Sequence, residues 1–256
     1  MPSGAATGAV VVKTSGGTSN AVTFTLTQNA AFSPSTISWT ATSSFAVGLS
    51  GHAAAFAELN GTTTTRAVYV IGGADNTNAP VTTVSYATVG GSGSLSGWAT
   101  TTALPIALSF DAAAAATPAN ARITAPGFLY VVGGATDASG HASANVYRGA
   151  LAANGTVSSW TQMTALPVPL HSLGALIFHG DLYVAGGATT GNAPVGTVYR
   201  ARIDSTGALG AWQTEAALPF ARAHFGFGPR RIPLRLRWGQ RGCGAQRRQP
   251  FGQHHR

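Results

Sequence analysis

The sequence is poor in charged residues, in cysteine and in long apolar runs. Only 9% of its 256 residues are Asp, Glu, Lys or Arg, against about 25% in an average soluble protein. We therefore expect no helical bundle or coiled coil. The single cysteine, Cys243, excludes a disulfide framework and a thiolate metal site. No apolar run reaches the ~18 residues of a membrane span, and no basic segment followed by an apolar one opens the chain, so we expect neither membrane insertion nor a signal peptide in it.

The excess of positive charge belongs to one segment of the chain. The formal net charge is +8, yet residues 1–228 contain equal numbers of acidic and basic side chains. The unbalanced charges are Arg230, Arg231, Arg235, Arg237, Arg241, Arg247, Arg248 and Arg256. A basic tail is not the basic face of a folded nucleic-acid-binding domain, so we expect no nucleic-acid partner.

Three segments of the chain repeat one pattern. Each contains an apolar strand that ends in two glycines, a Val-Tyr-like segment, a Gly-x-(Leu/Val)-x-x-Trp unit and, six residues after the Trp, a Leu-Pro pair. The glycine pairs are Gly72 and Gly73, Gly133 and Gly134, and Gly186 and Gly187; the tryptophans are Trp98, Trp160 and Trp212. The second Gly and the Trp are 25, 26 and 25 residues apart. This constant spacing predicts a repeat architecture.

Each repeat is expected to form four short β-strands. The first strand spans residues 53–57 in one repeat and 173–178 in another, and turn signals follow at Asn60-Gly61 and His179-Gly180. The diglycine is typical of a tight turn with close backbone approach. Extra length in residues 60–65 and in the alanine-rich run 111–120 is expected to be inserted into a loop. Because one four-stranded sheet cannot bury both its faces, such units must stack, radially or linearly.

Together these features resemble the Kelch repeat. The resemblance rests on the Tyr-Val-x-Gly-Gly strand, the Val-Tyr strand, and the Trp followed by Leu-Pro and then by His171, or by Arg222 and His224. It covers residues 34–228 and implies an all-β fold, part of a Kelch-type β-propeller with about three to four four-stranded blades. An orphan outer strand is expected around Trp39, and a fourth unit begins near Arg222.

Residues 1–28 resemble the last two strands of an IPT/TIG domain, an immunoglobulin-like module. Val22, Phe24 and Leu26 alternate with threonines after a Gly-Gly turn, which is the pattern of a half-buried strand. A whole immunoglobulin-like sandwich needs about 100 residues. We therefore expect a remnant of such a domain, in a chain that is truncated at both ends.

The tail, residues 229–256, departs from the repeat. His171 precedes Gly186 by 15 residues, which predicts a diglycine near residue 239, where the chain has Trp238-Gly239-Gln240 in arginine-rich sequence. Two interpretations stay open: a frameshifted reading of a fourth blade, and a genuine disordered basic tail.

Propeller function resides in loops at one end of the blades, and the loops after the diglycines carry the candidate residues. The candidate ligand-facing residues are Asp75, Asn76, Asn78, Asp137, His141 and Asn192. Asp75-Asn76-Thr77-Asn78 has some of the polarity of a calcium loop but lacks the Gly and distal Glu of an EF-hand. An Asx-rich turn is the preferred interpretation, and we expect no metal or cofactor.

Two sets of recurring side chains fit structural roles better than functional ones. His52, His171 and His224 are expected to share one repeat position, where a hydrogen bond to a neighbouring blade is favoured over catalysis. The repeat tryptophans fit either a sugar-stacking set or, preferably, packing between blades.

The sequence favours a non-enzymatic binding or adhesion module of a secreted or cell-surface protein, with an unidentified protein or carbohydrate partner. The galactose oxidase group joins a Kelch-like propeller to an immunoglobulin-like domain, but its copper site uses a Tyr crosslinked to Cys, and residues 1–228 contain no Cys. Neither Gly-x-Ser-x-Gly nor His-Glu-x-x-His occurs. Two alternatives stay open: a fragment of a carbohydrate-acting enzyme similar to galactose oxidase, and a non-functional fragment. Open propeller edges favour self-association.

Overall fold

The computed structural model describes four short strands between residues 8 and 24 and, with side chains, residues 41–45, 47–60 and 64–226. In these parts of the chain every helix or strand assigned is a β-strand, which confirms the predicted all-β class. No helix suited to crossing a membrane occurs in the same residues. The chain forms two compact units, Met1–Thr42 and Ser43–Arg256.

The first unit contains two antiparallel strand pairs. β1 (Gly8–Val10) pairs with β4 (Val22–Phe24), and β2 (Lys13–Thr14) pairs with β3 (Gly17–Thr18). The strand predicted to begin at Val22 is therefore present as β4. The other residues of the predicted IPT/TIG remnant, the strand around Trp39 and the basic tail lie outside the described residues.

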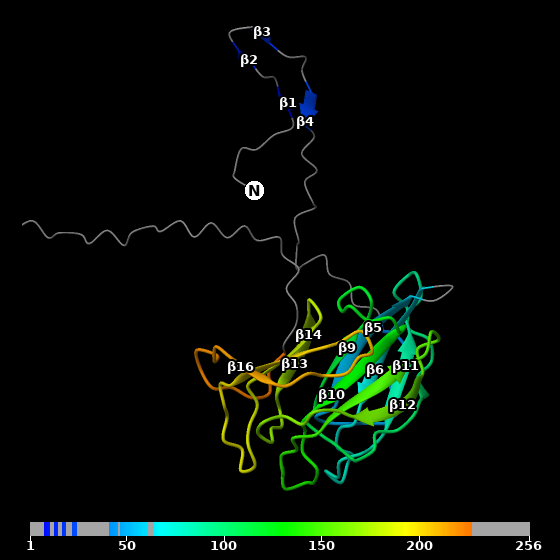
Figure 1. Cartoon of the computed structure of the whole chain (residues 1–256). Coiled ribbons are helices and arrows are strands. Elements are labelled where there is room, and N and C mark those ends of the chain that lie inside the picture. Colours follow the sequence, from blue (N-terminus) through cyan, green and yellow to red (C-terminus); the bar gives the residue numbers. More distant parts are fainter. Residues whose placement is uncertain are drawn as a thin grey trace, which may run out of the picture. The chain divides into compact units, whose positions relative to one another are not determined.

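The second unit contains three four-stranded antiparallel sheets, each a meander in chain order (Figure 1). Sheet 1 consists of β5 (Ala53–Asn60), β6 (Thr64–Ile71), β7 (Val84–Thr88) and β8 (Ala99–Thr100). Sheet 2 consists of β9 (Ala112–Ala116), β10 (Gly127–Val132), β11 (Val146–Leu151) and β12 (Val157–Gln162). Sheet 3 consists of β13 (Gly174–Phe178), β14 (Asp181–Ala185), β15 (Val198–Arg202) and β16 (Gln213–Glu215).

The alanine-rich run is a strand and not a loop insertion, so that part of the sequence prediction was wrong. β9 is the first strand of sheet 2 and packs beside both β5 and β13, the first strands of the other two sheets. Alanine has little intrinsic preference for strands, but small side chains suit a position where strands of three sheets converge. The extra length of this repeat lies in residues 117–126, between β9 and β10.

The three sheets share one register. Tyr69 of β6 pairs with Tyr86 of β7, Tyr130 of β10 with Arg148 of β11, and Tyr183 of β14 with Arg200 of β15. The residue after each of these second-strand tyrosines pairs with Ser85, Tyr147 or Tyr199. These pairings define equivalent positions in the three repeats.

The diglycines hold each sheet against the link that leads to the next one. Gly133 has φ +64°, and a Cβ there would lie 2.4 Å from the carbonyl oxygen of Leu170. Gly134 donates its N–H to the same oxygen at 2.9 Å. The equivalent bonds join Gly73 to Leu108 at 2.8 Å and Gly187 to Arg222 at 2.9 Å. Glycine is required because the backbone is left-handed and in contact with another backbone.

Tyrosine hydroxyls tie neighbouring sheets together. Tyr69 donates to the carbonyl of Gly155 at 2.7 Å, and Tyr130 donates to that of Gly207 at 2.7 Å. Both phenol groups are buried, and burial raises the pKa of each tyrosine. A buried hydroxyl needs such a partner, so these bonds select the stacking of one sheet on the next.

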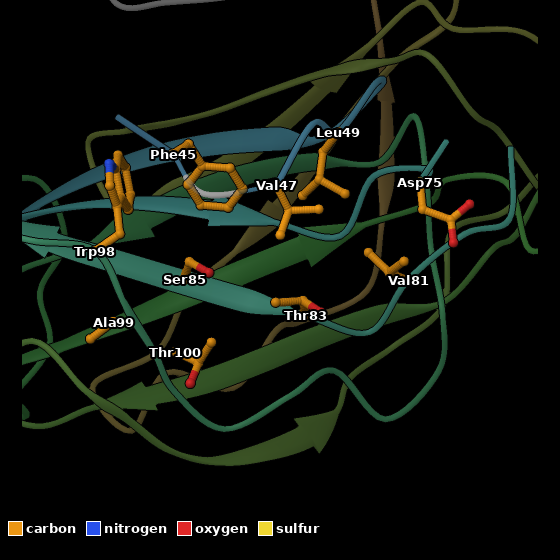
Figure 2. Close-up of a pocket in the computed structure, with 10 residues that line it drawn as sticks. All are labelled: Phe45, Val47, Leu49, Asp75, Val81, Thr83, Ser85, Trp98, Ala99 and Thr100. Carbon is orange, nitrogen blue, oxygen red and sulfur yellow. The ribbon is translucent and has the colours of Figure 1, made fainter. Parts of the chain in front are cut away.

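The tryptophans make the second set of ties. Each indole Nε1 donates to a carbonyl four residues after the preceding repeat's Trp: Trp160 to Thr102 at 2.9 Å and Trp212 to Thr164 at 3.0 Å. Trp98 donates to Ser43 at 3.1 Å, and its ring meets Phe45 edge-on at 5.2 Å (Figure 2). Ser43 stands four residues after Trp39 in the sequence. The segment that begins at Ser43 therefore occupies the position of the links after Trp98 and Trp160.

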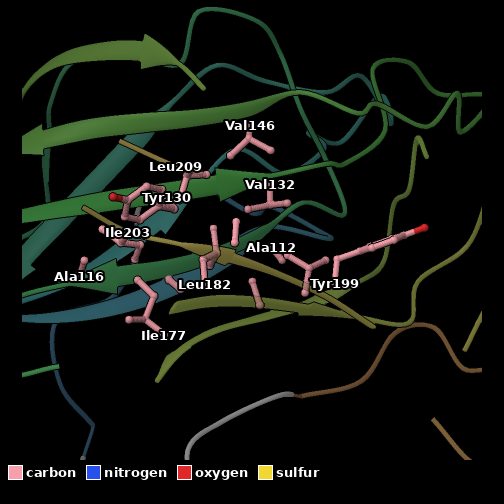
Figure 3. Packing of buried hydrophobic residues seen from close by; sticks show 14 of the residues in the cluster. Ala112, Ala116, Tyr130, Val132, Val146, Ile177, Leu182, Tyr199, Ile203 and Leu209 are labelled. Carbon is pink, nitrogen blue, oxygen red and sulfur yellow. The ribbon is translucent and has the colours of Figure 1, made fainter. Parts of the chain in front are cut away.

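The core lies between the sheets. One buried cluster fills the space between sheets 2 and 3, with Tyr130 and Val132 on one side and Leu182 and Tyr199 on the other (Figure 3). A second cluster lies between sheets 1 and 2. β10 is buried along its whole length because both faces of sheet 2 are covered. This stacking of four-stranded meanders is a propeller-like fold.

Candidate functional site

Two sets of loops lie at one end of the three sheets, and we call this end the diglycine face. In a meander, the connection between strands two and three and the link from strand four to the next sheet are at the same end. The first set comprises residues 74–80, 135–142 and 188–194, and the second comprises residues 50–52, 109–111, 171–173 and 223–225. Isolated bridges join the sets: Ser50 with Ala74, Ser109 with Ala135, and His171 with Ala188.

The Asp75 loop is organised by its own carboxylate. Asp75 Oδ1 accepts hydrogen bonds from Thr77 N at 2.8 Å, Thr77 Oγ1 at 2.6 Å and Ala79 N at 3.1 Å. The side-chain bond from Thr77, followed by the two backbone bonds, lowers the pKa of Asp75. Asn78 adopts φ +61° in the same turn. These contacts make an Asx turn, and Asn76 and Asn78 are exposed on it.

The Asp137 loop has the same construction. Asp137 Oδ1 accepts from Ser139 N at 2.9 Å and from His141 N at 3.2 Å, and its Oδ2 lies 2.5 Å from His141 Nδ1. The backbone bond from His141 is the largest cause that lowers the pKa of Asp137. Residue 142 donates its N–H to Thr190 Oγ1 at 3.0 Å, which joins this loop to the third one. In that third loop Asn192, at φ +64°, occupies the position of Asn78.

The turns that precede the first strands form a ladder across the three sheets. Gly51, Phe110, Ser172 and His224 all have φ between +53° and +59°. Phe110 N donates to Gly51 O at 2.5 Å, Ser172 N to Phe110 O at 2.7 Å, and His224 N to Ser172 O at 2.9 Å. Non-glycine residues in this conformation are strained, and such strain persists only where surrounding structure imposes it. The backbone bonds between turns supply that constraint.

The three histidines do not share a repeat position, so this prediction was wrong. The bridge His171 makes with Ala188 is the bridge that Ser50 makes with Ala74, whereas His224 is equivalent to Gly51. His52 comes one position later still. The spacing after the Leu-Pro pair carries the same shift, since His171 follows Leu166 by five residues and His224 follows Leu218 by six. His52 and His224 nevertheless border the same shallow depression of about 160 Å³.

Two buried polar groups lie on this face, and one of them, Asp111, was not singled out from the sequence. Asp111 is 7% exposed, and neither carboxyl oxygen has a hydrogen-bond partner among the described residues. Burial raises the pKa of Asp111 well above its usual value. His171 is 3% exposed and bonds Ser172 Oγ through Nδ1 at 2.9 Å, while burial and then His224 lower its pKa. The sequence signal that could have identified Asp111 is its position directly before the alanine run, which forms β9.

The arrangement offers polar recognition groups on loops of fixed conformation. Within residues 41–45, 47–60 and 64–226, no cluster of three or more His, Cys, Asp or Glu side chains could hold a metal ion. Of the six predicted ligand-facing residues, Asp75 also borders an apolar groove of sheet 1. The other five lie on the loops, where they are available to a partner.

Comparisons with known proteins bear on the fold. No family model matches the chain, and no curated protein matches it. The chain is similar to a solved structure titled "Structure of YjhT", with a TM-score of 0.50 and 18% sequence identity. The match covers 72% of this chain and 51% of that one, so the chain spans about half the length of this neighbour. At this identity, what the chain shares with that protein is its β-rich, propeller-like fold.

Proposed function

We propose that residues 34–228 are blades of a Kelch-type propeller in a non-enzymatic binding or adhesion module, and that the parent protein is secreted or displayed on a cell surface. The repeated motif supports the family assignment, because each of its parts has a defined place in the sheets. The diglycines contact the next link, Tyr69 and Tyr130 bond the next sheet, and the tryptophans bond the preceding link.

The same proposal includes a fourth blade. Arg222 accepts the bond from Gly187, and His224 donates to Ser172, as the equivalent residues do before sheets 2 and 3. The chain therefore reaches residue 226 on the path that, in the earlier repeats, enters a first strand. The exposed side chains Phe56 and Phe178, 53% and 50% exposed, support self-association through the outer sheets.

The observation that carries the binding proposal is the pair of carboxylate-centred loops on the diglycine face. Asp75 and Asp137 each hold a loop rigid while leaving amide, hydroxyl and imidazole groups exposed. Preformed polar loops on a rigid scaffold lower the entropy lost on binding. A protein or carbohydrate ligand, with many hydrogen-bonding groups, suits such a surface.

The test is an array of glycans and purified ectodomains probed with three forms of the chain. The double variant Asp75→Ala, Asp137→Ala should weaken binding to the recognised spots by about tenfold. Asp204→Ala is the matched control, because Asp204 caps Thr206 and Ala208 in the same way but at the opposite end of sheet 3. Binding that survives the double variant, or an array without any bound spot, refutes the proposal.

A further inference from the structure

One repeat position fills the space between the diglycines of two successive sheets, and we call it the junction position. Leu173 occupies it between sheets 2 and 3. A Cβ on Gly133 would lie 3.0 Å from the Leu173 side chain, and a Cβ on Gly187 would lie 2.9 Å from Leu173 Cβ. Leu173 is buried and belongs to the apolar cluster between these two sheets. An apolar side chain therefore seals this junction.

Asp111 occupies the junction position between sheets 1 and 2. A Cβ on Gly72 would lie 3.2 Å from Asp111 Oδ1, and a Cβ on Gly134 would lie 2.9 Å from Asp111 Cβ. These contacts are the counterparts of those that Leu173 makes one sheet later. A carboxyl group therefore stands where the next junction has an apolar side chain, and neither of its oxygens has a hydrogen-bond partner among the described residues.

The part of the chain that the structure describes offers this carboxyl no compensating charge. Burial raises the pKa of Asp111, and no charged neighbour among these residues acts on it. His52 and His224 border the depression beside it, and both side chains are exposed. Asp75 and Asp137, which follow the two diglycines, are used in their own exposed Asx turns. Water is therefore the partner that would stabilise an ionised Asp111.

We propose that the junction between sheets 1 and 2 opens locally when Asp111 loses its proton, whereas the junction between sheets 2 and 3 stays closed. Opening brings water to the carboxylate, where its ordinary pKa is about 4. The closed junction keeps the proton to a higher pH, because burial penalises the charged form. Between these two pKa values the open population rises by up to about tenfold per pH unit, so the junction is closed at low pH and loosens as the pH rises.

This opening would regulate the diglycine face. The Asp75 loop belongs to sheet 1 and the Asp137 loop to sheet 2, so their junction sets how the two loops are spaced. The Asp137 loop is bonded to the loop of sheet 3, since Ala142 N donates to Thr190 Oγ1 at 3.0 Å. A rise in pH therefore separates the Asp75 loop from the other two. This consequence rests on the binding function proposed above, whereas the opening itself does not.

The test is amide hydrogen exchange of the full chain, followed residue by residue by NMR between about pH 5 and pH 8 and corrected for the intrinsic pH dependence of exchange. Phe110 N–H, which donates to Gly51 O at 2.5 Å, reports on the first junction. Ser172 N–H, which donates to Phe110 O at 2.7 Å, reports on the second. We expect the protection of Phe110 to fall by at least about tenfold over this range, and that of Ser172 to change by less than about threefold.

Substitutions identify the group responsible. Asp111→Asn, neutral at every pH, should remove the pH dependence at Phe110, and Asp111→Leu should remove it while raising the protection. Asp204→Asn is the matched control, because Asp204 is an exposed carboxylate at the opposite end of sheet 3 and should leave the pH dependence unchanged. Equal pH dependence at Phe110 and Ser172, none at Phe110, or one that persists in Asp111→Asn overturns the proposal. No ligand enters this test, so its failure is distinct from a failure of the binding proposed for the diglycine face.

Discussion

Replacing Asp111 by leucine should stabilise the protein at neutral pH. Both carboxyl oxygens are buried without a hydrogen-bond partner in the described part of the chain, and an unsatisfied buried polar group costs about 1–3 kcal/mol. Sheet 3 has Leu173 at the equivalent position, and a buried leucine contributes about 1.5–3 kcal/mol. With about 1 kcal/mol subtracted for imperfect fit, we expect a gain of about 1.5–5 kcal/mol, or roughly 3–20 °C in melting temperature.

The stability of the unmodified chain should also depend on pH through this group. Burial raises the pKa of Asp111 in the folded state, because desolvation penalises the charged carboxylate. Between the ordinary carboxyl pKa of about 4 and the raised value, the folded protein keeps a proton that the unfolded chain releases. The stability this proton confers is complete below about pH 4 and is lost as the pH rises through the raised pKa.

The assay is urea denaturation followed by tryptophan fluorescence between about pH 4 and pH 9. Asp111→Asn, neutral at every pH, should remove this part of the pH dependence. Asp181→Asn is the contrasting control: Asp181 is 8% exposed but lies 3.3 Å from Arg200, so its loss should destabilise by about 1 kcal/mol. A pH profile identical for the unmodified chain and Asp111→Asn, or a less stable Asp111→Leu, would show that the carboxyl is not buried unpaired.

Three further substitutions test the ties between sheets in the same urea assay. Gly133→Ala places a Cβ against a carbonyl at positive φ and should cost about 2–4 kcal/mol, whereas Gly97→Ala, with open space around it, should cost less than about 1 kcal/mol; equal effects would contradict the close approach. Tyr130→Phe removes a buried hydrogen bond to the next sheet and should cost about 1 kcal/mol, while Tyr183→Phe, half-buried at the equivalent position of sheet 3, should be near neutral. Trp160→Phe should cost about 1–2 kcal/mol through its lost bond to the preceding link and reduced packing, and an unchanged urea midpoint would contradict that role.

The repeat could be predicted from the sequence because residues close together in the chain specify its strands and turns. Diglycines, the His179-Gly180 turn and the alternating apolar strands are short-range signals, and the structure places a strand or a turn at each of them. The alanine run was misinterpreted because its strand conformation depends on β5 and β13, which are far away in the sequence. The histidine alignment was wrong for a different reason: the distance from the Leu-Pro pair, five residues to His171 and six to His224, already separates the two positions, and the inter-sheet bridges agree with it.

The candidate loops could be located from the sequence, but their internal construction could not. Asp75 and Asp137 were selected as polar residues after diglycines, and an Asx turn was the preferred interpretation for the first of these loops. Their hydrogen bonds to Thr77 and His141 follow the geometry of that turn. Whether these loops bind a ligand stays a prediction, because recognition depends on a partner's chemistry.

The sequence by itself determined the all-β class and the four-strand pattern of the repeat, because turn residues and side-chain periodicity act over a few residues, but it did not identify the first strand of sheet 2. The tertiary structure alone decided which repeat positions are filled. Ser85 is 5% exposed at the position that Tyr147 and Tyr199 occupy in the other sheets, and the Asp111 carboxyl is buried without a hydrogen-bond partner among the described residues. Whether a residue is buried depends on side chains that other sheets contribute. The same residue type can therefore be stabilising at one repeat position and destabilising at another.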